Sequence, residues 1–351
     1  MRIKNRPARR VAAALVLTLL LCTQALARPA YLIPGGNTVG IKLYSEGLVV
    51  TQVEDGAAAQ RAGLRCGDRI VKCNGRSVRA AQTLAQLVQS GEAVVLQVLR
   101  GGQTAEFLVR PEQVGTRWQL GVQLRDNVSG IGTVTYYDPE TNAFGALGHG
   151  VSGSADGKLL PITSGYLVPA SVAAVERGVR GTPGALHGAF DVTQTCGLVT
   201  QNTAHGLFGT ANMLPQRAAL PVAAAEQVHT GAATILANVD GDAVEEYSIE
   251  ITKIDENAKT GRDLLLRMND ARLLERTGGV VQGMSGSPIL QDGRMVGAVT
   301  HVLVGDPEQG YGILIEHMLD AAARGGMDRV WSRESCMTGL VRSCSFCVYF
   351  D

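Results

Sequence analysis

The sequence predicts a mainly β protein with folded domains behind an N-terminal targeting segment. Three observations support this prediction. The chain has 351 residues, it contains 43 glycines with only 5% aromatic residues, and its apolar residues come in short runs separated by turn signals. Its 32 basic and 32 acidic residues balance to zero net charge, so there is no electrostatic case for a nucleic-acid partner.

Residues 1–28 are predicted to be a signal peptide or a signal anchor. Basic residues among the first ten precede the apolar run Val11–Cys22, and Ala25-Leu26-Ala27 supplies a small-x-small cleavage site. Basic residues before such a run hold the N-terminus inside and send the rest of the chain across the membrane. If the segment is removed, we expect the mature chain to begin between Arg28 and Asn37.

Residues 33–111 resemble a PDZ domain. Gly67–Gly75 matches the pattern G-D-x-I-x-x-x-N-G, in which Asn74-Gly75 is a strong hairpin signal. A short helix is expected at 57–63, a groove helix at 83–89 and a long strand at 94–100. Cys66 and Cys73 flank the hairpin strand and could be small buried apolar residues.

A PDZ groove binds a peptide as an added strand beside a helix. The glycine loop at 33–36 and the strand at 39–43 resemble the loop and strand that hold the peptide carboxylate. The predicted peptide-binding residues are Gly35, Gly36, Val39, Gly40 and Ile41. The alternative is that this domain only docks on its neighbour.

Residues 112–326 are predicted to form a β-barrel or β-sandwich, because several short strands are spaced by turn signals. The clearest strand is Tyr247–Ile254, in which apolar and polar residues mostly alternate. A terminal helix is expected at 316–324. The tail 327–351 holds three cysteines without a nearby histidine, which favours free thiols or one disulfide over a zinc site.

The stretch Gly283–Pro288 carries the strongest functional signal. Its glycines allow a sharp turn that exposes the Ser285 hydroxyl and aims backbone amides at one point. A nucleophilic serine needs a base, and His149 stands upstream in Gly148-His149-Gly150. We predict that Ser285 attacks a peptide carbonyl, that His149 takes its proton, and that the amides of Gly283 and Ser285 form the oxyanion hole.

The remaining histidines carry less information. His301 follows the nucleophile on a strand that could line the cleft, although a packed histidine is the more common case. No two histidines share a metal-ligand spacing, so we predict no metal and no cofactor.

From about residue 30 to 320 the chain resembles the stage IV sporulation protein B peptidases of endospore-forming bacteria. The resemblance rests on Phe144–Gly150, on Thr277–Ile289 and on Gly297–Val302. It implies a serine endopeptidase with a chymotrypsin-like double β-barrel and self-cleavage before the PDZ domain. It also implies a place between the forespore membranes, where the enzyme cuts a membrane-bound regulatory protein and thereby triggers late sigma-factor activation.

The third member of the triad has two candidates. Asp270 lies 15 residues before Ser285, where the resembling peptidases carry their proposed acid, and we favour it. It could instead be the N-cap of a short helix at 271–276. Asp191 follows His149 by 42 residues, a spacing closer to that of chymotrypsin-like barrels.

Two other functions remain open at this stage. The chain could be an exported PDZ scaffold with an inactive peptidase domain, or a general extracytoplasmic quality-control protease. Proteases of the second kind usually carry PDZ domains after the protease, whereas here the PDZ-like segment comes first. The expected partners are a membrane-bound protein substrate and a peptide or protein ligand of the PDZ domain.

Overall fold

The computed structural model describes residues 28–331 except 153–158, 256–257 and 259–260. The predicted targeting segment and nearly all of the Cys-containing tail therefore lie outside the described residues. Within them the chain is mainly β, as predicted. In this part of the chain, no helix combines the length and the apolar character that a membrane span requires.

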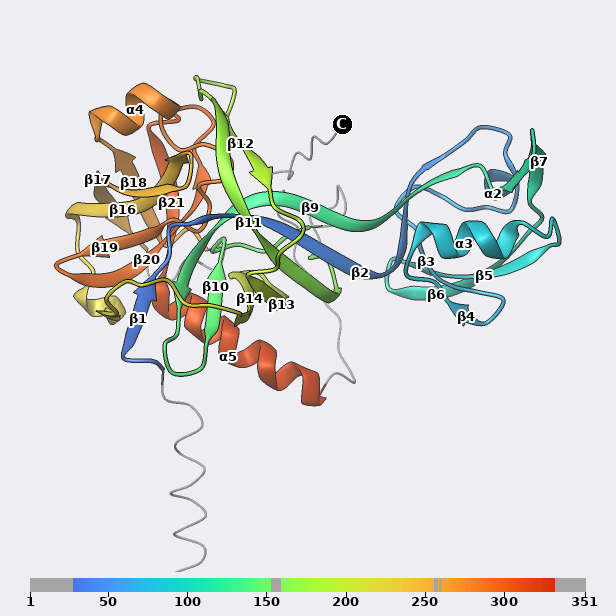
Figure 1. The fold of residues 1–351 in the computed structure, drawn as a ribbon, viewed down its shortest axis with the longest axis horizontal. Coiled ribbons are helices and arrows are strands. Elements are labelled where there is room, and N and C mark those ends of the chain that lie inside the picture. Colours follow the sequence, from blue (N-terminus) through green and yellow to red (C-terminus); the bar gives the residue numbers. More distant parts are fainter. Residues whose placement is uncertain (1–27, 153–158, 256–257, 259–260, 332–351) are drawn as a thin grey trace, which may run out of the picture.

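Six strands close the first barrel (Figure 1). Each is hydrogen-bonded to the next, and the last pairs again with the first. In ring order they are β2 (Thr38–Val53), β9 (Val122–Tyr137), β10 (Ala143–Ala146), β14 (Gly206–Ala211), β13 (Gly197–Thr203) and β11 (Ile162–Glu176). Three short strands extend this sheet: β1 (Tyr31–Pro34), β12 (Ala185–Phe190) and β15 (Leu220–Pro221).

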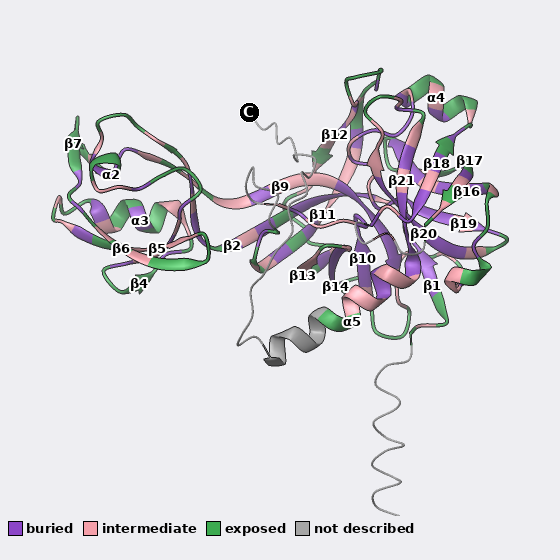
Figure 2. Cartoon of the chain, turned by 180° about the vertical axis from the view of Figure 1, so that it is seen from behind, coloured by how far each residue is buried: buried purple, intermediate pink, exposed green. Residues whose placement is uncertain are grey.

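A second ring of six strands forms the other barrel. In order they are β16 (Gly231–Asp240), β17 (Ala243–Ile254), β18 (Leu264–Met268), β21 (Gln309–Leu314), β20 (Arg294–Val302) and β19 (Pro288–Gln291). The alternation predicted for β17 is confirmed, since Tyr247, Ile249 and Ile251 are buried. Helix α4 (Ala271–Thr277) follows β18, and the expected terminal helix is α5 (Ile315–Trp331). Figure 2 shows buried residues running through the strands of both barrels.

The PDZ domain has its own core. Its further elements are α2 (Ala58–Arg61), β3 (Arg69–Cys73), β4 (Arg76–Ser77), α3 (Ala81–Val88), β5 (Val94–Arg100), β6 (Gln103–Val109), β7 (Glu112–Val114) and β8 (Arg117–Gln119). The predicted hairpin is confirmed, because Asn74 and Gly75 connect β3 to β4 with φ of 49° and 77°. The aspartate of the same motif, Asp68, is buried and ion-paired with Arg100 at 2.6 Å.

The domains are interleaved rather than consecutive. β2 and β9 are both 16 residues long and run from the PDZ domain into the first barrel (Figure 1). They pair with each other in the PDZ domain at Val49–Val53 and in the barrel at Thr38–Tyr44. The predicted PDZ boundary at residue 33 therefore includes a barrel strand, because a strand long enough to serve both domains carries no turn signal between them.

Candidate active site

The histidine and serine segments meet at two adjacent residues of β20. The Ser285 hydroxyl donates a hydrogen bond to the carbonyl oxygen of Thr300 at 2.8 Å. The His149 ring lies against His301, with ring centroids 5.0 Å apart. His149 follows β10 of the first barrel and Ser285 precedes β19 of the second. The structure thus places both residues at the junction of the barrels.

A residue of β9 joins these two segments through the backbone. The N–H of Thr133 donates to the carbonyl oxygen of Ser285 at 3.0 Å, and its own carbonyl accepts from the N–H of Leu147 at 3.2 Å. Gly286 lies so close to β9 that a β-carbon at this position would be 2.1 Å from the carbonyl oxygen of Thr133. The second glycine of the serine motif is therefore required by this close approach.

The Ser285 hydroxyl is directed to Thr300 in this structure, not to His149. Rotation about the single Cα–Cβ bond of serine re-aims its oxygen between staggered positions. Catalytic hydrogen bonds in proteases commonly become short only when substrate is bound. In this structure the Thr300 carbonyl accepts the hydrogen bond from Ser285, and a rotation about χ1 would direct Oγ elsewhere.

The His149 imidazole is set up as a neutral base. Its Nδ1 lies 3.0 Å from the carbonyl oxygen of Gly150. Because a carbonyl can only accept, Nδ1 carries the proton and Nε2 carries the lone pair. Burial lowers the pKa of His149 below 6.5, while the hydrogen bond to Gly150 acts in the opposite direction. The imidazole is neutral at physiological pH, as a general base must be.

Two backbone amides of the serine turn are available to a ligand. Within the described residues, the N–H groups of Gly283 and Ser285 donate to no protein acceptor. The amide between them, that of Met284, donates to the carbonyl of Val281 at 3.2 Å. Gly283 has a φ of 99°, which glycine adopts without strain. An oxyanion hole requires backbone N–H groups that have no protein acceptor and are held in place by their neighbours, and this turn provides both.

Asp270 does not contact His149. Its carboxylate caps α4, accepting from the N–H groups of Arg272 at 2.9 Å and Leu273 at 3.4 Å, and also from Ser248 at 3.2 Å. Partial burial tends to raise the pKa of Asp270, but the hydrogen bonds from Arg272 and these amides outweigh it and lower the pKa. In this structure the N-cap alternative is confirmed, and we correct the preferred assignment of Asp270 as the partner of His149.

Asp191, the other candidate for the triad acid, is also hydrogen-bonded away from His149. The Asp191 carboxylate accepts from the N–H of Thr193 at 3.0 Å and from the side-chain amide of Gln194 at 3.0 Å. These contacts are local to one turn, so the structure does not bring Asp191 to His149 either. A spacing in sequence gives no information on which of two distant aspartates reaches the histidine.

We predict that Asp270→Asn retains peptidase activity within about tenfold, as expected of a structural residue, because asparagine is also a good N-cap. Asp270→Ala should lower the free energy of unfolding by about 1 kcal/mol through loss of the cap. Hydrolysis rates and thermal unfolding of both variants check this. A loss near 10⁴-fold in Asp270→Asn with unchanged melting would restore Asp270 as the triad acid.

The predicted peptide-binding strand is not an open edge. Val39 pairs with Gly132 of β9 on one side and with Pro169 of β11 on the other. Gly40 and Ile41 continue the same double pairing. Since both edges are used inside the first barrel, Val39, Gly40 and Ile41 cannot accept an added strand, and this prediction is wrong.

The predicted carboxylate loop is likewise committed to the barrel. The amides of Gly35 and Gly36 donate to the carbonyls of Thr135 and Val134 at 2.9 and 2.8 Å. A β-carbon on Gly36 would lie 2.7 Å from the side chain of Val244 in the second barrel. Gly36 therefore allows close packing between the barrels and Gly35 allows close packing on β9, and neither amide is available to a peptide.

The open edge of the PDZ domain lies on β9 instead. Among the described residues, Val122–Arg125 pair only with β2 and Asp126 has no strand partner, so the other edge of this stretch is unpaired. The amides of Leu120 and Gly121 before it donate to no acceptor in the same part of the chain. The sequence analysis placed this glycine in the peptidase domain, 112–326, although Leu120-Gly121-Val122 follows the same pattern as Val39-Gly40-Ile41.

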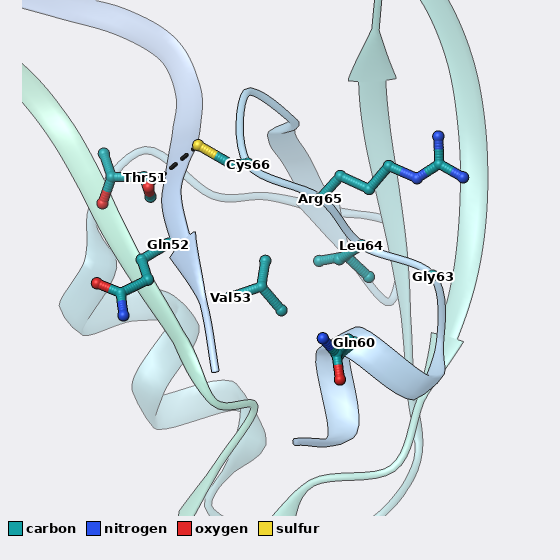
Figure 3. Close-up of a pocket in the computed structure, with 8 residues that line it drawn as sticks. All are labelled: Thr51, Gln52, Val53, Gln60, Gly63, Leu64, Arg65 and Cys66. Carbon is teal, nitrogen blue, oxygen red and sulfur yellow. Dashed lines mark hydrogen bonds between the residues drawn. The ribbon is translucent and has the colours of Figure 1, made fainter. Parts of the chain in front are cut away.

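A separate pocket lies between the end of β2 and the turn after α2 (Figure 3). It is lined in part by Thr51, Val53, Leu64 and Cys66, and includes no residue of the serine site. The Cys66 thiol is exposed and donates to the carbonyl of Thr51 at 3.1 Å, contrary to expectation. Cys73 is buried as expected, and burial raises the pKa of its thiol.

A serine and a histidine contributed by two six-stranded barrels define a chymotrypsin-like peptidase, here combined with a PDZ domain. The family model for SpoIVB peptidase S55 matches residues 116–319, and a PDZ domain model matches residues 49–100. Since the first match covers more than half of the chain, the protein belongs to the SpoIVB peptidase S55 family. This confirms the resemblance found in the sequence.

Curated relatives match over a short segment. A probable periplasmic serine endoprotease DegP-like of Chlamydia trachomatis is 40% identical over 73 residues, which is 20% of this chain and 15% of that protein. Serine protease HTRA3 of Homo sapiens is 36% identical over 70 residues, 20% of this chain and 16% of its own length. This chain thus spans only a small part of these relatives.

Solved structures give weaker matches. The active form of the Rv3671c protease of M. tuberculosis is 17% identical, with a TM-score of 0.34, over 62% of this chain and 80% of that one. The PDZ domain of the SdrC-like protein of Listeria monocytogenes is 21% identical, with a TM-score of 0.22, over 23% of this chain and 90% of that domain. TM-scores this low add nothing to the fold described above.

Proposed function

We propose that the protein is a serine endopeptidase in which Ser285 is the nucleophile and His149 the general base. One observation carries this proposal: both segments are hydrogen-bonded to Thr133 and both contact adjacent residues of β20. The family assignment supports the same chemistry. An inactive scaffold would not require a neutral, partly buried histidine beside a serine turn with two uncommitted amides.

Acylation of Ser285 proceeds in two proton transfers, and water then hydrolyses the acyl-enzyme through the same two transfers at His149. As Oγ of Ser285 attacks the peptide carbonyl, Nε2 of His149 takes its proton, and it then gives this proton to the leaving amine. The amides of Gly283 and Ser285 donate to the oxyanion, and loss of one such donor typically costs about 3 kcal/mol of transition-state stabilisation. The Gly150 carbonyl stabilises the imidazolium that forms between the two transfers.

A fluorophosphonate probe tests this proposal directly. The full chain should be labelled at Ser285, as located by peptide mass mapping, and heat-unfolded protein should not be labelled. A folded protein that takes up no probe would favour the inactive scaffold.

The biological role follows from the family resemblance. We propose that the enzyme is exported, that it acts between the forespore membranes, and that it cuts a membrane-associated regulatory protein to trigger late sigma-factor activation. The family match is the ground on which we propose this role and not general quality control. In the producing organism, Ser285→Ala should then block late sigma-factor activation, whereas a quality-control protease would leave sporulation intact.

Self-cleavage is part of the proposal, and we propose that the cut lies before β1. β1 pairs with β9 and β15, and Leu32 and Ile33 are buried. A cut inside or after β1 would remove a strand from the barrel sheet. Within the expected window of 28–37, the cut that preserves the fold therefore falls before Tyr31.

We also propose that the PDZ domain binds a peptide along β9, at Val122–Asp126. Val122 and Leu124 on this strand and Leu87 on α3 are partly buried apolar residues that pack on the PDZ core. The uncommitted amides of Leu120 and Gly121 stand at the start of the strand, where a peptide carboxylate would be held.

Leu87→Lys should weaken peptide binding at this groove at least about tenfold, since a charge would replace an apolar contact. Ala85→Lys is the matched control, because residue 85 is exposed and two positions away on the same helix. Selection of random C-terminal peptides by phage display checks this: the wild type and Ala85→Lys should enrich a common motif and Leu87→Lys should not. Equal enrichment by Leu87→Lys would place the ligand elsewhere.

A further inference from the structure

Thr133 reaches the serine turn with its side chain as well as its backbone. It lies in the barrel half of β9 and is 1% exposed. Its hydroxyl donates to the carbonyl oxygen of Gly283 at 2.8 Å, across 150 residues of sequence. Together with the N–H bond to Ser285, this contact attaches the turn to β9 at two points.

The hydroxyl fixes one particular peptide plane. The peptide between Gly283 and Met284 is held at its oxygen by Thr133 and at its nitrogen by the carbonyl of Val281. The two uncommitted amides, of Gly283 and Ser285, belong to the peptide planes on either side of it.

Because residue 283 is a glycine, the peptide plane that follows it depends on the Thr133 hydrogen bond for its orientation. Gly283 has no β-carbon to restrict its torsions, and its φ of 99° lies in a region where glycine moves freely. A rotation of the middle peptide would turn the adjoining N–H groups away from a common point. The turn is also buried at Gly283 and Met284, so a Gly283 carbonyl without its donor would be left unsatisfied inside the protein.

We propose that Thr133 is a positioning residue that holds the oxyanion-hole amides of Gly283 and Ser285 in their catalytic orientation. It acts through the turn and touches no substrate. This inference rests on the proposed peptidase function. It assigns a role in the peptidase site to a residue of β9, the strand that also forms the open edge of the PDZ domain.

The chain offers a matched control on the same strand. Thr135 is also fully buried, yet its hydroxyl has no hydrogen-bond partner in the described part of the chain. Thr133→Val and Thr135→Val make the same isosteric change, and only the first removes a hydrogen bond to the serine turn.

The test compares kcat and KM on a peptide substrate, per active site titrated. Thr133→Val should lower kcat about 10- to 100-fold, less than the loss of an oxyanion donor itself, with KM nearly unchanged. The affinity for a peptide boronate, whose tetrahedral adduct occupies the oxyanion hole, should fall in parallel. Thr135→Val should leave both values within about twofold, as expected of an isosteric change that removes no hydrogen bond.

Thr133→Ser, which keeps the hydroxyl, should retain most of the wild-type kcat. If Thr133→Val does not fold, Thr133→Ala against Thr133→Ser supplies the same comparison. Equal kcat and boronate affinity in the hydroxyl-lacking and hydroxyl-bearing variants would overturn the inference while wild-type activity upheld the peptidase. An inactive, unlabelled wild type would overturn the proposed function itself.

Discussion

Ser285→Ala should reduce peptide hydrolysis by at least about 10³-fold, because it removes the oxygen that attacks the peptide carbonyl. His149→Ala should cause a loss of similar size, since the serine then lacks the base that accepts its proton. The two residues act as one unit, so the double variant should be no slower than either single variant. Initial rates on a fluorogenic peptide, with melting temperatures alongside, measure this.

Matched replacements at distant positions serve as controls. Ser77→Ala changes an exposed serine in the PDZ domain, and His187→Ala removes an exposed histidine of β12. Both should keep rates within about twofold of the wild type, as surface substitutions usually do. Additive losses in the double variant, or wild-type rates in either single one, would show that another residue is the nucleophile or base.

Gly286→Ala should disable the site through packing alone. The new β-carbon would lie 2.1 Å from the carbonyl oxygen of Thr133 and 2.6 Å from the nitrogen of Leu147, and both are backbone atoms. Alanine would also have to adopt a φ of 99°. Overpacking and a strained backbone together should cost about 3 kcal/mol of unfolding free energy. Displacing Ser285 by about 1 Å should lower the rate about 100-fold.

Gly293→Ala separates the effect of the steric clash from the effect of the strained backbone. Gly293 has a φ of 70° but nothing lies within 4 Å of the position a β-carbon would take. This variant should lose only about 1 kcal/mol from the left-handed backbone and keep its catalytic rate. Denaturant unfolding and peptide hydrolysis of the two variants give the comparison. If Gly286→Ala were as stable and as active as Gly293→Ala, Gly286 would not be in close contact with the Thr133 backbone of β9.

The local patterns of the sequence predicted much of the fold. The turn at Asn74-Gly75, the alternation in Tyr247–Ile254 and the helix at 316–324 all appear where they were expected. Each of these features is set by residues that are close together in the sequence, so the local pattern is sufficient to predict it. The serine turn belongs to the same group, because Gly283 and Gly286 take positive φ values that only glycine accepts readily.

The failed predictions concern pairings between distant segments. Two stretches of similar sequence, 39–41 and 120–122, could each have been the peptide edge, and only sheet topology shows that the first is enclosed by β9 and β11. Asp270 satisfied both a triad spacing and a helix cap, and hydrogen-bond geometry shows the cap.

The sequence by itself predicted the class of chemistry and the presence of a PDZ domain, and it supplied the histidine and serine that we propose for the reaction. The tertiary structure alone decided which strand edge is open, where the acidic residues point, and that Thr133 holds the serine turn. The physical reason is that turns and periodicity arise from local sterics and burial. Hydrogen bonds such as the one from Thr133 to Gly283 join residues 150 positions apart, and only the closed barrels bring such partners together.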